Sequence, residues 1–401
     1  MKRWIVMGLA LPVLGGCMVL IGESFDGYSA RGPDAGSDTG SAAGADVGVD
    51  ARDAGVVFSP SPHAIDGCLP TFTVANGVGY PDHAPVAFDV PPGNVGIVTD
   101  DDPRCFQPSG LPKLPYCLIL AEAVKVRGFL GVLGSRPLVI VALHDIEITG
   151  AINAAGEDAF GKVGPGGNEL GNATALAGGG GSAFAQGCDG CPGGAGVAFG
   201  LDAGLHGGGS GGGGLLPNPD CHGGGNGGGA LQIVSLCGAV KLSSNANLNA
   251  NGGGGASVTN AACGAGFGGG AGGTVWIQGA SFQLDKANGA TIDLFGGGGG
   301  GGTCRETTAD AWTAGVNANG RTLGNGAACA NASGGAGAIG SDDPTGDAGA
   351  AGTAATATPP AESTCGGGGG AVGVAVLVTD VGKCTDSVGF IHGACVDRPL
   401  H

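Results

Sequence analysis

The chain has 401 residues, of which 92 are glycine and 22 are proline, and this composition is typical of low-complexity proteins rather than compact enzymes. Hydrophobic residues nevertheless make up 42% of the chain and charged residues only 12%, whereas disordered chains are poor in apolar residues, so part of the chain must fold. A formal net charge of −17 argues against bulk attraction to nucleic acid, and we expect no nucleic-acid partner.

The N-terminal residues have the pattern of a secretory signal peptide. Lys2 and Arg3 precede an uncharged apolar run that extends from Trp4 to Leu14. The run ends in Leu14-Gly15-Gly16-Cys17, which resembles the lipobox of bacterial lipoproteins. The resemblance implies a signal peptide over residues 1–16 and a diacylglyceryl group on Cys17, with Cys17 as the first residue of the mature chain.

A single uncleaved membrane helix is the alternative for this segment. The apolar run continues through Ile21, so residues 4–22 are near the length that spans a bilayer. Pro12 and the Gly15-Gly16 pair weaken such a helix, which favours the lipoprotein interpretation. In many Gram-negative bacteria, lipoproteins retained in the inner membrane resemble one another in having Asp directly after the lipidated cysteine. This chain has Met18 at that position. We therefore expect a lipid anchor in the outer membrane and a protein exposed at the cell surface.

We expect residues 17–60 to comprise the lipidated Cys17 and an acidic tether that follows it. From Glu23 to Ser59 the chain consists largely of Asp, Gly, Ala and Ser, with too few large apolar residues to form a core. Its carboxylates repel one another and extend the segment, so we expect a disordered linker that holds the folded part away from the membrane.

We expect residues 61–117 to form an irregular β segment that caps the fold. Within it, Asp100-Asp101-Asp102 follows the apolar strand Val95–Val98. Three successive carboxylates are suited either to a hard cation or to an acidic turn, and the turn is the more common use.

Short apolar strands recur after Cys117. A three-residue unit with an outward polar residue at its centre appears as Val124–Val126, Ile146–Ile148, Val240–Leu242 and Phe282–Leu284. An apolar strand precedes each unit, at Leu118–Leu120, Leu138–Val141, Leu231–Val234 and Val275–Ile277. A weaker strand follows each unit, at Leu130–Leu133, Ala151–Asn153, Asn247–Asn249 and Thr291–Asp293. Three short strands per unit predict a solenoid coil rather than a hairpin.

The spacing of these units predicts a short right-handed parallel β-helix over residues 118–380. Val126 and Ile148 are 22 residues apart, which is about one turn of a three-sided β-helix. The later units are separated by longer Gly-rich segments, near 153–229, 250–273 and 296–371, which must leave the stack. A last strand is expected at Val372–Val378 and a Cys-containing C-terminal tail at 381–401.

If the coils stack in register, their central residues form an outward ladder. Its members are Lys125, Glu147, Lys241 and Gln283. A charged binding stripe is one interpretation, but we favour a solvated face, because exposed ion pairs contribute at most about 1 kcal/mol.

The stretch from Cys117 to Gly156, together with recurring Gly-Gly-[Ala/Thr]-apolar-x-Ile units, resembles uncharacterised Gly-rich exported lipoproteins of soil bacteria. The core of these proteins resembles the pectin-lyase-like parallel β-helix. The resemblance covers about residues 117–380 and implies an all-β fold. It does not imply an activity, because it rests on repeat texture and not on a catalytic signature.

Two structures are possible for the Gly-rich segments. Runs such as Gly296–Gly302 have no side chains to bury, and fixing glycine costs more backbone entropy than fixing any other residue, so flexible loops are one alternative. Polyproline-II-like strands that pack backbone against backbone are the other. Interspersed cysteines favour the second alternative, with disulfides that tie the loops down.

Most of the cysteines are expected to form disulfides, as in other exported chains. Thirteen of the fourteen remain if Cys17 is lipidated, so at least one is unpaired, and Cys237 in an apolar strand is the candidate for a free buried thiol. The expected near pairs are Cys188 with Cys191, Cys304 with Cys329, and Cys384 with Cys395. Cys188 and Cys191, followed by His206, Cys221 and His222, also permit a zinc or redox site, but the long Gly-rich gaps make this weak.

No catalytic pattern stands out. The coil carboxylates Asp145, Glu147, Asp285 and Asp293 lie on different sides, so no pair suggests glycoside chemistry. The letters Gly208-Gly209-Ser210-Gly211-Gly212 match a hydrolase elbow but lie inside a glycine run. We predict no catalytic, cofactor-binding or metal-binding residues.

The sequence therefore favours a non-enzymatic, lipid-anchored envelope protein with a structural or adhesive role. Its partners are the membrane, through the anchor, and a glycan or extracellular matrix. A polysaccharide-processing lyase or hydrolase on a pectin-lyase-like β-helix is the alternative, and an envelope-assembly component facing the periplasm is a lesser one.

Overall fold

The computed structural model describes the chain in segments. These are residues 73–74, 78–79, 87–107, 113–156, 164, 205, 207–208, 211, 224–257, 266–302, 304–305, 328, 332–333, 356–357, 362–363, 366–367, 369–379, 383–387 and 389–398. The predicted signal peptide, Cys17 and the predicted tether lie outside these residues.

Three parallel sheets dominate the fold, and each is named here after its first strand. The β3 sheet contains β3 (Phe88–Val90), β6 (Val124–Val126), β9 (Ile146–Ile148), β12 (Ala239–Leu242) and β15 (Ser281–Leu284). The β4 sheet contains β4 (Asn94–Val98), β7 (Phe129–Leu133), β10 (Ala151–Asn153), β13 (Asn247–Asn249), β16 (Thr291–Asp293) and β22 (Ile391–His392). The β5 sheet contains β5 (Cys117–Ala121), β8 (Leu138–Ala142), β11 (Ala230–Ser235), β14 (Thr274–Gln278), β21 (Val374–Val378) and β23 (Ala394–Arg398).

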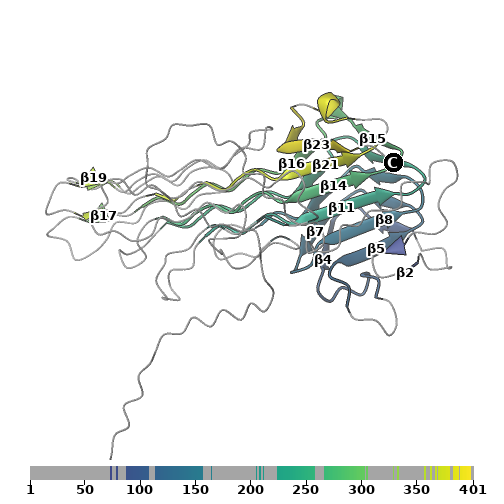
Figure 1. Ribbon diagram of the computed structural model, residues 1–401, viewed down its shortest axis with the longest axis horizontal. Helices are drawn as coiled ribbons and strands as arrows, with labels where there is room; N and C mark the ends of the chain where they lie inside the picture. Colours follow the sequence, from purple (N-terminus) through teal and green to yellow (C-terminus); the bar gives the residue numbers. More distant parts are fainter. Residues whose placement is uncertain are drawn as a thin grey trace, which may run out of the picture. The chain divides into compact units, whose positions relative to one another are not determined.

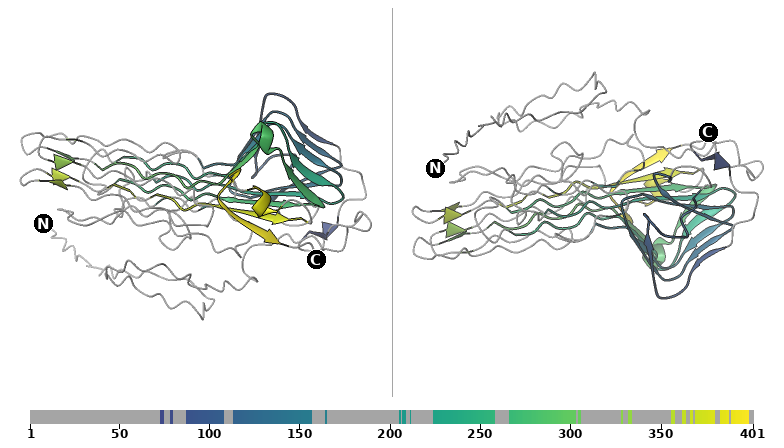
Figure 2. Two further views of the ribbon diagram at one scale, coloured as in Figure 1. Left: turned by 90° about the horizontal axis from the view of Figure 1, so that it is seen from above. Right: turned by 90° about the horizontal axis from the view of Figure 1, so that it is seen from below.

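The strands follow one another from sheet to sheet in a fixed order along the chain. β5, β6 and β7 belong to three different sheets, and so do β8, β9 and β10. Successive strands within one sheet therefore come from successive coils, and Figure 2 shows the three sheets as the sides of a triangle. This architecture is a parallel β-helix, as the repeat predicted.

The stacking register agrees with the predicted ladder. Lys125 aligns with Glu147, Glu147 with Lys241, and Lys241 with Gln283. Asp89 of β3 extends the ladder by one coil, because it aligns with Lys125.

The interior of the triangle is filled by aliphatic side chains. Each coil sends alternate residues inward, and one core cluster includes Ile119, Ile140, Ile233 and Ile277 from the β5 sheet. Burial of these side chains is the main favourable term for the fold, because each fully buried large aliphatic contributes about 1.5–3 kcal/mol.

The β5 sheet is buried on both faces. All five residues of β8 are buried, and so are all five residues of β14. A second hydrophobic cluster on the outer face contains Val139, Val141 and Trp276, together with Leu114 and Leu205 from outside the sheet. This double burial explains the uninterrupted apolar run Leu-Val-Ile-Val-Ala of β8, since parallel strands covered on both faces lose the apolar-polar alternation.

The long insertions all leave the β-helix between the β4 sheet and the β5 sheet. They connect β10 to β11, β13 to β14, and β16 to β21. Because they share one corner, their glycine-rich parts lie side by side, and Figure 1 shows them running together away from the sheets.

These glycine-rich parts are hydrogen-bonded to one another and are called the glycine bundle here. It comprises the described residues of 224–229, 250–256, 266–273, 294–302 and 366–373. Phe267, Gly270 and Gly273 donate from their backbone N–H groups to the carbonyls of Ala256, Gly253 and Ala250 at 3.1, 2.9 and 2.7 Å. The step of three residues matches the three residues per turn of polyproline II.

One segment of the bundle contacts four others. Besides donating to 250–256, segment 266–273 accepts at Gly270 from Gly297, at 2.7 Å, and at Gly268 from Gly225, at 2.9 Å. Gly272 donates to Ala371 at 2.9 Å. The described glycine-rich parts therefore adopt the ordered, backbone-packed alternative.

Glycine is required where these segments meet. A Cβ atom added to Gly297 would overlap the carbonyl oxygen of Gly253, and one added to Gly270 would overlap that of Asn226. The bundle interior thus has room for backbone only.

The β-helix extends beyond the expected range of 118–380 at both ends. β3 and β4 pair with β6 and β7 within the expected capping segment. In the expected tail, β22 pairs with β16, and β23 pairs with β21.

The remaining described elements are short. They are the antiparallel pairs β1 (Thr73–Val74) with β2 (Val78–Gly79), β17 (Cys304–Arg305) with β20 (Glu362–Ser363), and β18 (Ala332–Ser333) with β19 (Thr356–Ala357), and the 3-10 helices η3 (Lys286–Asn288) and η4 (Cys384–Ser387). Among the described residues, no helix is long and apolar enough to cross a membrane.

Candidate functional site

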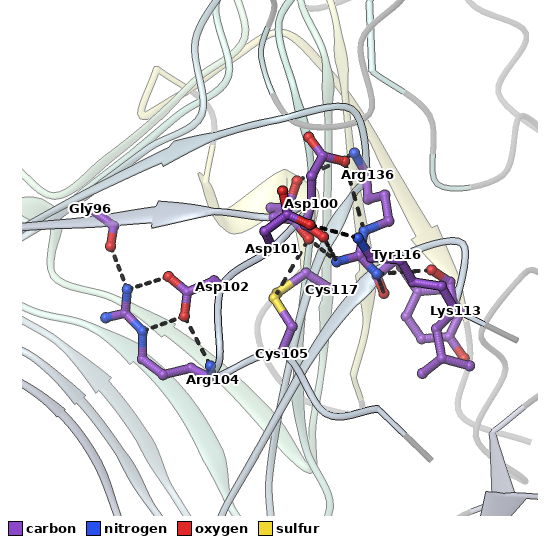
Figure 3. Close-up of a disulfide and its surroundings, with 12 residues drawn as sticks. Gly96, Asp100, Asp101, Asp102, Arg104, Cys105, Lys113, Tyr116, Cys117 and Arg136 are labelled. Carbon is purple, nitrogen blue, oxygen red and sulfur yellow. Dashed lines mark hydrogen bonds and ion pairs between the residues drawn. A yellow bond between two sulfur atoms is a disulfide. The ribbon is translucent and has the colours of Figure 1, made fainter. Parts of the chain in front are cut away.

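The acidic run Asp100-Asp101-Asp102 forms a salt-bridged turn at the first coil (Figure 3). The Asp102 carboxylate accepts from the Arg104 guanidinium at 2.6 and 2.7 Å, and Asp101 lies 3.0 Å from the Lys113 ammonium. Asp100 accepts from the backbone N–H and the hydroxyl of Ser135 at 2.8 and 2.5 Å.

These partners lower the pKa values of two carboxyl groups in the turn. The hydrogen bond from Arg104 lowers the pKa of Asp102 below its usual value. Burial acts to raise the pKa of Asp100, but the hydrogen bonds from Ser135 outweigh it and the net shift is downward. The three carboxylates are thus used internally, which favours the structural turn over the cation site. No group of metal-ligating side chains occurs in the part of the chain that the structure describes.

The two ends of the β-helix each carry a disulfide. Cys384 is joined to Cys395, one of the predicted pairs, and this bond ties η4 to β23. Cys105 is joined to Cys117, a pair that we did not anticipate, and this bond ties the acidic turn to β5. Both bonds close short segments, of 11 and 12 residues.

The prediction of a free buried thiol at Cys237 is wrong, because this residue is disulfide-bonded. The apolar run suggested that Cys237 lies within a strand, but β11 ends at Ser235, so Cys237 stands in the turn that leads to β12. Cys188, Cys191 and Cys329 lie outside the described residues, as does the side chain of Cys304. The alternative zinc or redox site at Cys188 and Cys191 therefore stays untested.

The outward ladder on the β3 sheet behaves as a solvated face. Lys241 pairs with Asp145 at 2.6 Å and not with the neighbouring Glu147. Its hydrogen bond lowers the pKa of Asp145. Arg127 pairs with Asp89 at 2.7 Å, with both side chains about half exposed at 48%. Exposed pairs of this kind contribute little stability.

A different side of the β-helix concentrates polar side chains. On the outer face of the β4 sheet, register places Asn153 beside Asn249, Asn249 beside Asp293, and Asp293 beside His392. The four side chains form one row across four coils, with neighbouring strands about 4.8 Å apart. Together with Asn247 and Asn251 they are called the asparagine face here, and all six residues are half-buried.

Asp293 is the centre of this face. One carboxylate oxygen lies 2.6 Å from Nδ1 of His392, and the other accepts from Nδ2 of Asn247 at 2.6 Å. Asn247 also donates to the Thr291 hydroxyl at 2.8 Å. The His392 ring stacks on Phe295, with ring centroids 5.0 Å apart and planes inclined by 17°.

Three asparagines on the face are held by backbone groups. Oδ1 of Asn153 accepts from the N–H of Ala155 at 3.3 Å, and Oδ1 of Asn249 accepts from the N–H of Asn251 at 3.0 Å. Oδ1 of Asn251 accepts from the N–H of Phe295 at 2.6 Å. Each bond fixes the carboxamide through its oxygen, and within the described residues the three Nδ2 groups have no protein partner.

The sequence indicated only part of this face. Asp293 is one of the coil carboxylates that the sequence indicates, whereas His392 falls in the predicted C-terminal tail and not in a coil. A usable signal existed, since Ile391-His392 repeats the isoleucine and the following polar residue of Ile292-Asp293 one coil later. The separation of 99 positions between Asp293 and His392 obscured it.

The other residues considered for catalysis lie away from the asparagine face, and Asp145 and Glu147 share one side of the β-helix, although we expected the coil carboxylates on different sides. Asp145 and Glu147 belong to the side of the β3 sheet, and Asp285 accepts from Asn288 at the start of η3. Gly208 and Gly211, from the hydrolase-like letters, donate to Gly228 and Gly225 of the glycine bundle. They serve backbone packing there.

No protein-family model, curated protein or solved structure matches this chain. The asparagine face therefore has to be interpreted from its own geometry.

Proposed function

We propose that the protein is a non-enzymatic, lipid-anchored component of the bacterial cell envelope with a structural or adhesive role. Cys17 anchors it in the outer membrane, the acidic tether spaces it from the lipid, and the β-helix faces outward. This proposal extends the resemblance to Gly-rich exported lipoproteins with a pectin-lyase-like core.

The glycine bundle is the observation that carries the proposal. Its segments share backbone hydrogen bonds with several neighbours at once, as with the four partners of segment 266–273, and they rise from one corner of the β-helix. A bundle of cross-bonded polyproline-II strands is stiffer than a flexible loop, because fluctuation of one strand breaks bonds to several others. Such a projection is suited to contact with another surface at a distance from the β-helix.

The anchoring step is tested on intact cells by protease and biotin accessibility, with acyl-chain labelling, for wild type and Cys17→Ala. Wild type is expected to be acylated and accessible from outside, whereas the variant is released or lost. A protein that is acylated but shielded until the outer membrane is opened would contradict the surface role and would favour envelope assembly in the periplasm.

A polysaccharide-processing enzyme is the second candidate, and the Asp293–His392 pair favours it. A carboxylate that holds Nδ1 of an imidazole orients the ring as a general base. The test is product release from neutral and uronate polysaccharides by wild type and Asp293→Asn. Turnover that the substitution abolishes would establish this alternative, and no turnover on either panel would reject it.

A further inference from the structure

We propose that the asparagine face of the β4 sheet binds a strand of neutral polysaccharide. The inference rests on the proposed adhesive function and names the surface and the ligand class that serve it. Its residues are Asn153, Asn247, Asn249, Asn251, Asp293 and His392.

The hydrogen-bonding groups of the face suit sugar hydroxyls. A hydroxyl both donates and accepts, so its recognition needs donors and acceptors close together. The Nδ2 groups of Asn153, Asn249 and Asn251 supply donors, because backbone N–H groups occupy their Oδ1 atoms. Oδ1 of Asn247 supplies an acceptor, since its Nδ2 is held by Thr291 and Asp293.

The face is also fixed before a ligand arrives. Asp293 is bonded on both oxygens, and three asparagines are bonded to the backbone, so few rotamers remain to be frozen on binding. Side chains that need no ordering avoid about 0.5–1.5 kcal/mol each on association.

Two aromatic rings lie beside the row of polar side chains. Phe295 stacks with His392 at one end of the row. Beyond the other end, Phe129 of β7 is 41% exposed, and its ring lies near Gly131, which aligns with Asn153. The apolar C–H face of a pyranose packs on such rings, while its hydroxyls reach the adjacent amides.

The repeat of the β-helix favours a polymer over a single sugar. Asn153, Asn249 and Asp293 occupy equivalent positions on successive coils, so similar groups recur about every 4.8 Å along the stack. A chain of sugar units lying along the coils meets these groups repeatedly.

Charge selects a neutral ligand. Asp293 places a carboxylate in the middle of the row, and none of the six residues of the face is Lys or Arg. A polyuronate therefore meets a carboxylate with no permanently charged cation on the face to offset it.

The experiment measures binding of the purified full chain to a soluble β-glucan, a galactomannan and polygalacturonate. We expect binding to a neutral polymer and weaker or no binding to polygalacturonate. Asn153→Ala combined with Asn249→Ala removes two donors and is expected to weaken binding about tenfold, since each net hydrogen bond contributes roughly 0.5–1.5 kcal/mol.

A matched control variant carries Glu147→Gln and Gln283→Ala, two changes on the ladder of the β3 sheet, and is expected to bind as wild type does. Unchanged thermal unfolding of both double variants shows that the fold is retained. Failure to bind any neutral polymer, or binding that the Asn153/Asn249 variant leaves intact, would overturn the inference.

Cell attachment separates this inference from the proposed function. If surface-exposed protein still mediates attachment when the asparagine face is substituted, the face is not the binding surface but the adhesive role stands. If the protein is not surface-exposed yet the purified chain binds the polymer through these residues, the face stands and the surface role fails.

Discussion

At the residue scale, glycine is required in the bundle because backbones approach each other closely there. Gly297 and Gly270 each face a backbone carbonyl of another segment, and this leaves no space for a Cβ atom. The entropy that glycine loses on ordering is offset by hydrogen bonds that no larger residue would allow.

Gly297→Ala is therefore expected to destabilise the bundle by about 1–3 kcal/mol or more, the usual cost of overpacking a tight interior. The measurement is chemical unfolding monitored by limited proteolysis within residues 250–302. Gly96→Ala is the matched control, because a Cβ atom at Gly96 has no neighbour within 4 Å. Equal stability of the two variants would contradict tight backbone packing at Gly297.

The acidic turn predicts how stability depends on pH. The pKa of Asp102 is lower in the folded chain than its usual value of about 3.9. Its contribution is thus fully present above about pH 4 and is lost as the pH falls through the depressed folded value. We expect Asp102→Asn to flatten the acid side of the stability profile, measured by urea unfolding between pH 3 and pH 7.

Glu122→Gln provides the comparison for this profile, since it removes the same charge at an exposed position. An acid limb that is as steep in Asp102→Asn as in wild type would show that the Arg104 pair does not contribute.

At the element scale, the two ends of the β-helix are the weak points, because a terminal coil has a neighbour on one side only. The structure strengthens both with a short disulfide, Cys105–Cys117 at the first coils and Cys384–Cys395 at the last. At the last coil the bond keeps η4 against β23, where Cys384 and Cys395 both pack on the core.

Replacing Cys384 and Cys395 by Ser is expected to cost about 2–4 kcal/mol and to loosen β22 and β23 first. Hydrogen exchange of peptides covering residues 389–398 measures the effect. The paired substitution of Cys105 and Cys117 is the control, and it should loosen the first coils and leave the last coil unchanged. Uniform loosening of the whole β-helix in either variant would show that the ends are not independent.

At the scale of the whole molecule, the β-helix and the glycine bundle share one hydrogen-bonded frame. Gly229 donates to Ala154, Gly273 donates to Ala250, and Gly373 donates to Leu294, each at 2.7 Å, where the insertions leave the sheets. The bundle therefore starts from backbone positions that the β-helix has already aligned.

Backbone amides of the bundle are expected to resist hydrogen exchange nearly as well as those of β11 and β14. Exchange measured by mass spectrometry on peptides covering 266–273 and 294–302 tests this, with the chain in denaturant as the fully exchanged reference. Complete exchange within seconds under native conditions would indicate flexible glycine loops and would remove the support for a stiff projection.

The coil strands were predictable because their apolar alternation is local. Ile146–Ile148 and Val240–Leu242 became β9 and β12 in the expected register, with the interrupting insertions placed correctly between coils. His392 was harder to predict, since its role depends on Asp293, which lies 99 positions earlier in the chain. The asparagine face was missed for the same reason, because its row is assembled from coils that the glycine-rich insertions separate.

The sequence by itself determined the β-helix, since the spacing of apolar residues specifies which side chains each coil buries. It also determined that the inserts are rich enough in glycine to pack without side chains. Only the tertiary structure decided that they do so, because each backbone N–H needs a carbonyl from another segment, and only the stacked coils bring those segments together.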